Sequence, residues 1–384
     1  MKIYMDFNAT TPVLPEVSET VADAMQNAWG NPSSGHELGT KARGMLDKAR
    51  MRIASLINAE PDEIVFTSGG TESNNLAIIG CVQARRHRGS HLVTTRIEHP
   101  SVLNPFLHLL EHGWKVDFAS PDLTGIVAVD AVERLIRTDT VMVSVMLANN
   151  ETGAIQPVKE IAGLCRQKGI IIHADAAQAV GKMPVDVRAL GIDLMTIAGH
   201  KLYAPKGIGA LFVRKGIEID NILYGAGQER GIRPGTEPVP LACGLGMACK
   251  LMQEEGSHAR DRIAGLRDKM YSIMKDMFPG MVRFVPPDMT LVNTLAVSFP
   301  GLEGAAILAR AGDVMASTGA ACHDRSVKVS HVLSAMGIDD TTAMGMIRLS
   351  LGIMTTGQEV SRAAESIAAA AMDLENERRG NGFH

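Results

Sequence analysis

Lys201 and Asp175 are the two side chains whose positions first indicate chemistry. Lys201 lies in AGHKLYAPKGIGALFVR (198–214), where it follows an expected strand and is crowded by glycines and apolar residues. A lysine with few solvating neighbours has a lowered amine pKa and can form a Schiff base. Asp175 lies at the end of an apolar run (171–176), and a carboxylate buried there needs a cationic partner such as a protonated pyridine nitrogen.

A third segment, TSGGTESNN (67–75), is typical of a strand that enters a helix through a pair of glycines. A helix N-terminus with free N–H groups, preceded by small residues, binds phosphate. Each feature also has a simpler interpretation: a surface lysine, a helix N-cap at Asp175, or a tight turn capped by Thr71. The chemical interpretation is favoured because Lys201 and Asp175 follow neighbouring strands at their carboxyl ends, where ligands of parallel sheets bind.

One of the five cysteines differs from the others in its surroundings. Cys322 lies in STGAACHDRSVKVSHVL (317–333), between small residues and a charged, helix-breaking stretch, which predicts an exposed loop thiol. The nearby positive side chains would lower its pKa and favour the nucleophilic thiolate. The remaining cysteines lie within helical patterns and are expected to pack in the interior; they are Cys81, Cys165, Cys243 and Cys249.

These residues are positioned by an alternation of short apolar runs with longer helical patterns. Strands are expected at 64–69, 91–95, 141–147, 171–176, 193–199 and 209–214. Such runs, apolar on both faces and separated by helices, predict a largely parallel sheet covered on both sides. Beyond the glycine-rich stretch 225–240 the pattern changes to a smaller α+β unit, with strands at 293–301 and 346–352 and helical patterns at 241–277, 303–312, 330–337 and 357–376. We therefore expect an N-terminal arm (1–15) that packs with the small domain, a large domain (16–255) and a small domain (256–384) that carries the cysteine loop.

The bulk composition excludes several classes of protein. The 384 residues are 46% hydrophobic and 21% charged with a formal charge of -4, so no direct nucleic-acid ligand is expected. The first residues have no secretion signal, and no stretch is long and apolar enough to span a membrane, so we predict a cytoplasmic protein. The cysteines show no CxxC spacing, which argues against both a disulfide framework and a metal site.

Taken together, the motifs resemble one family. DFNATTP, TSGGTESNN, RIEHPSV, NNETGAIQPV, HADAAQ, GHKLYAPKGIGAL, GAGQERGIRPGTE and RLSLG are similar, in order, to the cysteine desulfurase and selenocysteine lyase family of fold-type-I pyridoxal-phosphate enzymes. The resemblance covers nearly the whole chain. It implies an α/β fold with a mostly parallel seven-stranded sheet covered by helices, plus a smaller α+β domain.

The resemblance also implies a role for each matching residue. Lys201 would hold pyridoxal 5'-phosphate, with Cys322 as the persulfide carrier and His99 as a residue that stacks on the ring and moves protons. Asp175 would keep the pyridine nitrogen protonated. The other expected cofactor contacts are Gln178 at the phenolic oxygen, Gly70, Thr71 and His200 at the phosphate, and Asn150. Thr236 would bind the phosphate of a second subunit, so a homodimer is expected; the residues expected near the substrate are Asn31, Asn150 and Arg348.

The function implied is removal of sulfur from L-cysteine, which gives L-alanine and a persulfide that is passed to a sulfur-acceptor protein, as in iron–sulfur cluster synthesis. Ala198 and Gly199 depart from the family at a place where many desulfurases carry a phosphate-binding serine. Pro234 and His323 are more typical of selenocysteine lyases, whereas the segment between Cys322 and Ser330 matches the long loop of desulfurases. A selenocysteine lyase is therefore the alternative, followed by an aminotransferase and a catalytically silent interaction protein.

Overall fold

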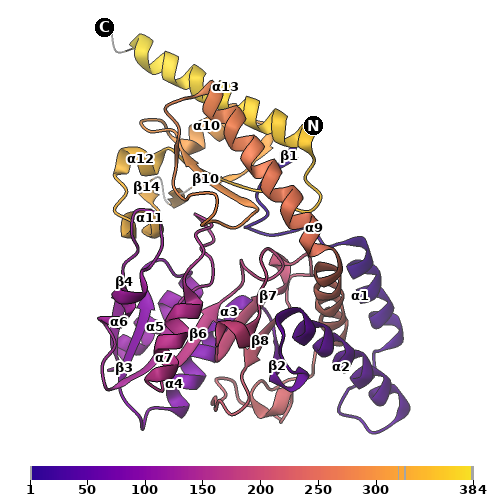
Figure 1. The fold of residues 1–384 in the computed structure, drawn as a ribbon. Coiled ribbons are helices and arrows are strands. Elements are labelled where there is room, and N and C mark those ends of the chain that lie inside the picture. The colour runs from indigo at the N-terminus through magenta and orange to yellow at the C-terminus, as the bar shows by residue number, and fades with distance from the viewer. Residues whose placement is uncertain (1, 319, 324–325, 382–384) are drawn as a thin grey trace.

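The computed structural model describes residues 2–318, 320–323 and 326–381, and within 320–323, 326–328 and 380–381 it describes the backbone alone. A seven-stranded sheet forms the centre of the larger part of the molecule (Figure 1). Its strand order is β2-β8-β7-β6-β5-β3-β4; the neighbours from β7 to β4 are parallel, and β8 is antiparallel to both of its neighbours. In sheet order the strands are β2 (Ile64–Thr67), β8 (Gly209–Val213), β7 (Leu194–Ala198), β6 (Ile171–Asp175), β5 (Thr140–Ser144), β3 (His91–Thr95) and β4 (Lys115–Ala119). The predicted α/β class with a mostly parallel seven-stranded sheet is confirmed.

Strand β4 is the member of this sheet that the sequence pattern did not indicate. It lies at the edge, next to β3, and of its five residues only Ala119 is buried. The other six strands are buried at every position, which is why their apolar runs are visible in the sequence. An edge strand that carries Lys115 and Asp117 lacks that pattern.

Helices cover both faces of the sheet because successive residues of a strand point to opposite sides. Val65 packs on one face with apolar residues of α5 (Pro100–Glu111), whereas its neighbours Ile64 and Phe66 pack on the other face with those of α2 (Glu37–Ile57). The remaining helices of this part are α1 (Pro15–Asn27), α3 (Gly70–Asn75), α4 (Cys81–Ala84), α6 (Val129–Glu133), α7 (Val158–Gln167) and α8 (Val187–Leu190).

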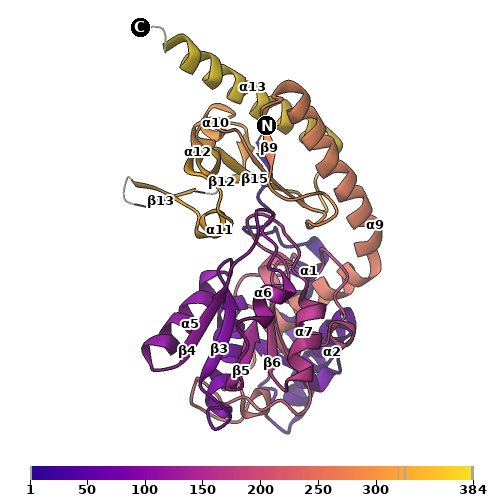
Figure 2. The same cartoon turned by 60° about the vertical axis from the view of Figure 1, so that its left-hand side comes forward.

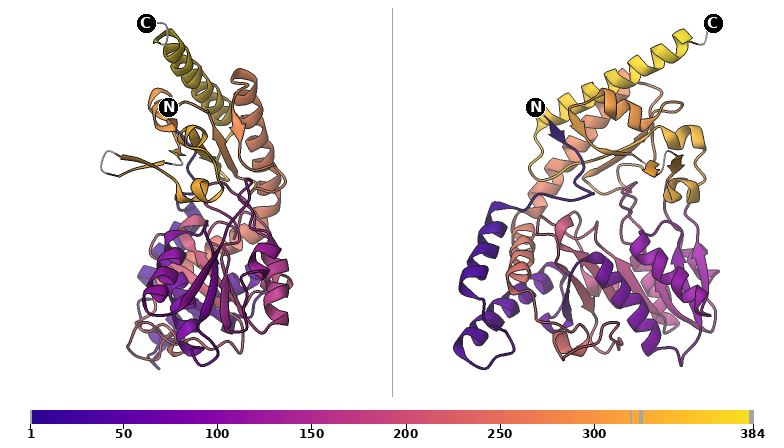
Figure 3. Two further views of the ribbon diagram at one scale, coloured as in Figure 1. Left: turned by 90° about the vertical axis from the view of Figure 1, so that its left-hand side faces the viewer. Right: turned by 180° about the vertical axis from the view of Figure 1, so that it is seen from behind.

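A second, smaller layer lies beyond the large sheet (Figures 1 and 3). Its four-stranded antiparallel sheet has the order β12-β15-β10-β9. The first strand, β1 (Ile3–Tyr4), pairs in parallel with β11 (Val314–Met315), and Ile3 and Met5 are part of the apolar core of this layer. The other elements are β9 (Val282–Arg283), β10 (Thr294–Ser298), β12 (Ser317–Thr318), β15 (Met346–Ser350), α10 (Gly304–Arg310), α11 (His331–Ala335), α12 (Asp340–Met344) and α13 (Gly357–Asn381).

Helix α9 (Val239–Met277) joins the two layers and is 39 residues long (Figure 3). Its N-terminal half contributes Leu245 and Met252 to the core of the large sheet, whereas its C-terminal half contributes Ile263 and Met270 to the core of the small layer. The domain boundary expected at residue 255 therefore falls inside a continuous helix, between these two groups of core residues.

Cys322 lies in a strand, although the sequence predicted a loop. Strand β13 (Ala320–His323) pairs antiparallel with β14 (Ser326–Val329), and Cys322 lies opposite Val327. In Figure 2 β13 extends outward from the small layer. The many charged residues of this segment concealed the strand-forming valines of β14. The side chain of Cys322 lies outside the described part of the chain.

No helix among the described residues combines the length and the apolar character that a membrane crossing requires.

Candidate active site

A cavity of about 330 Å³ opens at the carboxyl ends of the parallel strands and faces the small layer. Asp175 ends β6, Ala198 ends β7, and Arg348 reaches the cavity from β15 of the small sheet. The site is therefore built from both layers. The predicted site residues that line it are Gly70, Thr71, His99, Asn150, Asp175, Gln178, His200, Lys201 and Arg348.

Of the predicted site residues whose side chains the structure describes, two do not line this cavity. Asn31 is exposed and its Oδ1 accepts a hydrogen bond from the backbone N–H of Ser33. Thr236 is exposed in the segment that follows η4 (Glu229–Gly231). A single chain does not bring either side chain to the other site residues.

Lys201 lies in the single turn η3 (Gly199–Lys201), directly after β7. Its Nζ donates hydrogen bonds to the backbone carbonyls of Asn8, at 2.6 Å, and Ala9, at 2.7 Å. Burial lowers the pKa of Lys201 to about 8, and the positive charge of Arg348 lowers it further, whereas Asp6 and Asp175 act in the opposite direction. Near neutral pH a useful fraction of this amine is unprotonated, which a Schiff base or a proton acceptor requires.

Asp175 is 5% exposed, and its carboxylate is oriented by two neutral donors. Oδ2 accepts from Nδ2 of Asn74 at 2.8 Å, and Oδ1 accepts from the backbone N–H of Ala177 at 2.9 Å. Neither donor carries a charge that would balance the carboxylate. A cationic group bound in the cavity would supply that balance.

His99 is connected to Asp175 through a chain of hydrogen bonds. Its Nδ1 accepts from the backbone N–H of Ser101 at 3.1 Å and lies 2.8 Å from Ser101 Oγ, which in turn accepts from Asn74 Nδ2 at 2.8 Å. Burial is the main cause that lowers the pKa of His99; Lys201 and His331 lower it further, against the effect of Asp175. The imidazole is therefore neutral near pH 7, and its proton lies on Nε2 because Nδ1 accepts from the backbone.

Asn74 and Ser101 were not assigned a role from the sequence. Both lie inside motifs that the sequence singled out, TSGGTESNN and RIEHPSV, but nothing in those motifs indicates that they contact each other. Asn74 Oδ1 is also buried without a hydrogen-bond partner among the described residues. This unpaired acceptor lies at the cavity.

The opposite end of the cavity is formed by backbone turns. Strand β2 enters α3 through Gly69, whose φ of +152° favours glycine, and Gly70 and Thr71 form the first turn of the helix. The free N–H groups of this turn suit an anion. His200 lies beside them, and burial, reinforced by Lys201, lowers its pKa to about 4, so it is a neutral donor or acceptor.

Arg348 is 8% exposed, and its guanidinium is held by three hydrogen bonds. Nη1 donates to the carbonyl of Asn150 at 2.9 Å, while Nη2 donates to Oδ1 of Asp6 at 2.6 Å and to Oγ of Ser317 at 2.9 Å. Its Nε is buried without a partner among the described residues. The guanidinium is thus fixed in position and keeps a free donor, as recognition of a carboxylate requires.

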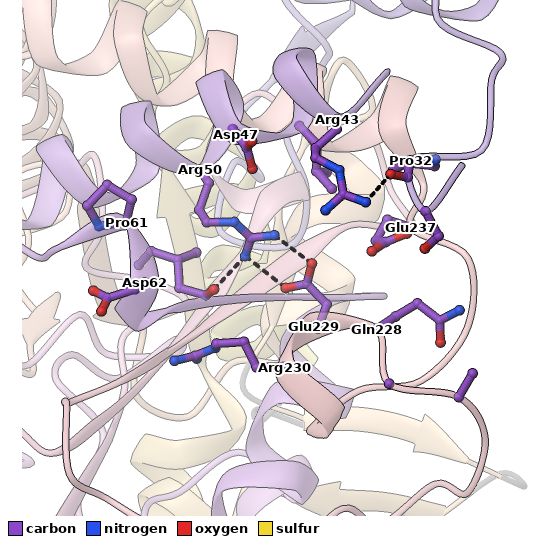
Figure 4. A pocket seen from close by; sticks show the side chains of 15 residues that line it. Pro32, Arg43, Asp47, Arg50, Pro61, Asp62, Gln228, Glu229, Arg230 and Glu237 are labelled. Carbon is purple, nitrogen blue, oxygen red and sulfur yellow. Dashed lines mark hydrogen bonds and ion pairs between the residues drawn. The ribbon is translucent and has the colours of Figure 1, made fainter. Parts of the chain in front are cut away.

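A second cavity, of about 460 Å³, lies beside α2 and the segment 226–237 (Figure 4). Its main feature is a bidentate ion pair between Arg50 and Glu229, at 2.6 and 2.8 Å, and Glu229 also accepts from the backbone N–H of Phe66 at 2.8 Å. These charges neutralise each other. We therefore interpret the pair as a structural connection that fixes the segment preceding Thr236 against the large sheet.

The chain is similar to known proteins over nearly its full length. The family model described as aminotransferase class-V matches residues 3–363. A "Cysteine desulfurase IscS" of Glaesserella parasuis serovar 5 (strain SH0165) is 42% identical over 380 residues, which is 97% of this chain and 94% of that protein. Among solved structures, a "NIFS-LIKE PROTEIN" is 36% identical with a TM-score of 0.90 over 96% of this chain and 99% of its own. A structure titled "SspA in complex with cysteine" is 34% identical with a TM-score of 0.81 over 92% and 100%, respectively.

Proposed function

Because the chain belongs to the class V aminotransferase family, we propose that it is a pyridoxal-phosphate-dependent cysteine desulfurase. It converts L-cysteine to L-alanine and transfers the sulfur to a cysteine of its own. The observation that carries this function is that Lys201, Asp175 and Arg348 line one cavity. The cofactor requires an amine that forms a Schiff base and a carboxylate without a cationic partner. The amino-acid substrate requires a fixed guanidinium.

The residues present fit pyridoxal phosphate. The amine of Lys201 would bind its aldehyde, Asp175 would pair with its ring nitrogen, and the first turn of α3 with His200 would bind its phosphate. Ala198 has no hydroxyl to offer the phosphate, so the donors on that side are the backbone and His200. When bound, the cofactor supplies an electron-deficient ring that accepts the electron pair released when the Cα–H bond of the substrate breaks.

Each of these side chains has a separate role in the reaction. Arg348 binds the substrate carboxylate and Lys201, released from the cofactor, takes the Cα proton on Nζ. His99, a neutral imidazole that lines the same cavity, would stack on the cofactor ring and would carry a proton on Nε2. These roles match the pKa values lowered by burial at Lys201 and His99.

A thiolate removes the sulfur from the substrate by attacking it. Cys322 Sγ attacks the sulfur of the substrate, a sulfur–sulfur bond forms, and the carbon–sulfur bond breaks with its electron pair left on carbon. Protonation of that carbon, Cβ, and return of the proton from Lys201 Nζ to Cα give alanine, and the persulfide remains on Cys322. The other four cysteines are buried, and burial raises the pKa of Cys81, Cys165 and Cys249 to about 12, so they cannot supply the thiolate.

The test replaces the proposed carrier. Cys322→Ala should retain the absorbance of the bound cofactor and lose sulfide release from L-cysteine, since the cavity is intact and the acceptor is gone. Cys243→Ala is the matched control, because this cysteine lies in α9 and should leave turnover unchanged. Unchanged turnover in Cys322→Ala would remove this residue from the mechanism. Selenocysteine measured beside cysteine tests the alternative substrate, which a strong preference for selenocysteine would establish.

The proposal extends to the assembly. Thr236 and Asn31 are exposed and lie outside the cavity of their own chain, which is consistent with residues that complete the site of a second copy. We therefore propose that the active enzyme is a homodimer, which passes its persulfide to a sulfur-acceptor protein.

A further inference from the structure

Lys182 is a cationic side chain beside the cavity that the proposed mechanism does not use. It lies in the turn after β6, where its backbone N–H donates to the carbonyl of Ala179 at 3.0 Å. Its Nζ donates to Oε1 of Gln178 at 2.5 Å and to Oδ1 of Asn8 at 2.9 Å. Burial, Lys201 and Arg348 all lower the pKa of Lys182 well below its ordinary value, so a charge is costly here. The two hydrogen bonds need no charge, because a neutral amine has two N–H donors.

These contacts decide which way the Gln178 amide points. Its Oε1 is occupied by Lys182, and its Nε2 donates to the carbonyl of Asn8 at 2.9 Å. An amide nitrogen has two N–H donors, so one remains for the cavity that Gln178 lines. If the amide were flipped, its oxygen would face the Asn8 carbonyl and the cavity, and its nitrogen would face the Lys182 amine.

Asn8 makes the arrangement rigid. It is 1% exposed, and its Oδ1 also accepts from Asn293 Nδ2 at 3.0 Å, while its own Nδ2 donates to Oγ1 of Thr294 at 2.9 Å. The carbonyl that receives Gln178 also receives Lys201. Asn8 is therefore fixed to the small sheet and holds Lys182 in place. Lys182 in turn holds the Gln178 amide.

We propose that Lys182 is a positioning residue that locks the Gln178 amide with its N–H directed into the cavity, toward the phenolic oxygen of the cofactor. This inference rests on the proposed function, since that oxygen belongs to pyridoxal phosphate. A donor fixed at this oxygen stabilises its anionic form. Loss of the donor makes the oxygen bind a proton more strongly, so the protonated form of the bound cofactor persists to higher pH.

The experiment is a spectrophotometric pH titration of the purified holoenzyme without substrate. In Lys182→Met the midpoint of the cofactor absorbance change should rise by about one pH unit, the size expected for a lost hydrogen bond to a charged oxygen. Gln178→Ala should raise it by a similar amount. The double variant should match Gln178→Ala alone, because Lys182 acts through that amide.

Two further variants keep the test decisive. Lys182→Gln retains an uncharged N–H donor toward Gln178, so its midpoint should lie closer to that of the unmodified enzyme than the midpoint of Lys182→Met does. This variant also keeps the proposal testable if Lys182→Met does not fold. Lys206→Met is the matched control, since it removes an exposed lysine that does not line the cavity and should leave the midpoint in place.

An unmoved midpoint in Lys182→Met, or a shift that adds fully to that of Gln178→Ala, overturns the inference and leaves the proposed function standing. A chain that takes up no pyridoxal phosphate overturns both. A holoenzyme that shows the shift but releases no sulfide from cysteine supports the positioning role and contradicts the desulfurase activity.

Discussion

Replacement of Arg348 by glutamine tests the substrate end of the site. Arg348 is 8% exposed, and its guanidinium is held by the carbonyl of Asn150, by Asp6 and by Ser317, so it cannot move to follow the substrate. Truncation of one member of a buried, hydrogen-bonded charge pair costs about 2–5 kcal/mol. Arg348→Gln also removes a cation that lowers the pKa of Lys201, so less of this amine is unprotonated near neutral pH, which adds to the loss. A net loss of about 3 kcal/mol corresponds to a fall of roughly 100-fold in kcat/KM.

The assay measures alanine formation against cysteine concentration over a range of pH. The fall should appear mainly in KM, because the carboxylate contact exists both before and during the reaction. The pKa of Lys201 should rise, so the acidic limb of the rate profile should move to higher pH. Arg362→Gln is the matched control: this arginine forms a partly exposed ion pair with Asp313 on the surface of the small layer, and its loss should change kcat/KM less than twofold. A value of kcat/KM for Arg348→Gln within threefold of the parent enzyme, with cofactor absorbance retained, would refute the assignment.

Two further predictions concern single residues. In the cofactor-free protein, acetylation of Lys201 followed by mass spectrometry should have its midpoint near pH 8, because the ammonium form that predominates below the lowered pKa is unreactive; a midpoint near the ordinary lysine value of 10.5 would contradict it. Arg50→Met should lower the stability to urea by about 3–5 kcal/mol, because it leaves the carboxylate of Glu229, 2% exposed, without its cation. Arg134→Met, which breaks an exposed ion pair, should lower the stability by less than about 1 kcal/mol. Equal losses of stability in the two variants would contradict the prediction that the buried pair contributes more than the exposed one.

Much of the large layer is encoded in local pattern. Six of the seven strands of the large sheet are buried at every position, and a strand buried on both faces appears as an apolar run whatever its neighbours are. Asp175 and Lys201 follow such runs directly, so their place at the edge of the sheet was predictable. The edge strand β4 and the strand pair β13–β14 that contains Cys322 were not, because charged residues interrupt their patterns.

The orientation of the site side chains depends on contacts between segments far apart in the chain. Arg348 is fixed by Asp6, 342 residues away, and Gln178 by the carbonyl of Asn8, 170 residues away. No periodicity or local spacing records such pairs, because each residue is ordinary in its own segment. Residue type and order along the chain therefore predicted that Lys201 and Asp175 are chemical groups of the site. The direction of the Gln178 amide, the anchoring of Arg348 and the lowered pKa of Lys201 exist only after both layers have packed around the N-terminal segment and excluded water from these polar groups.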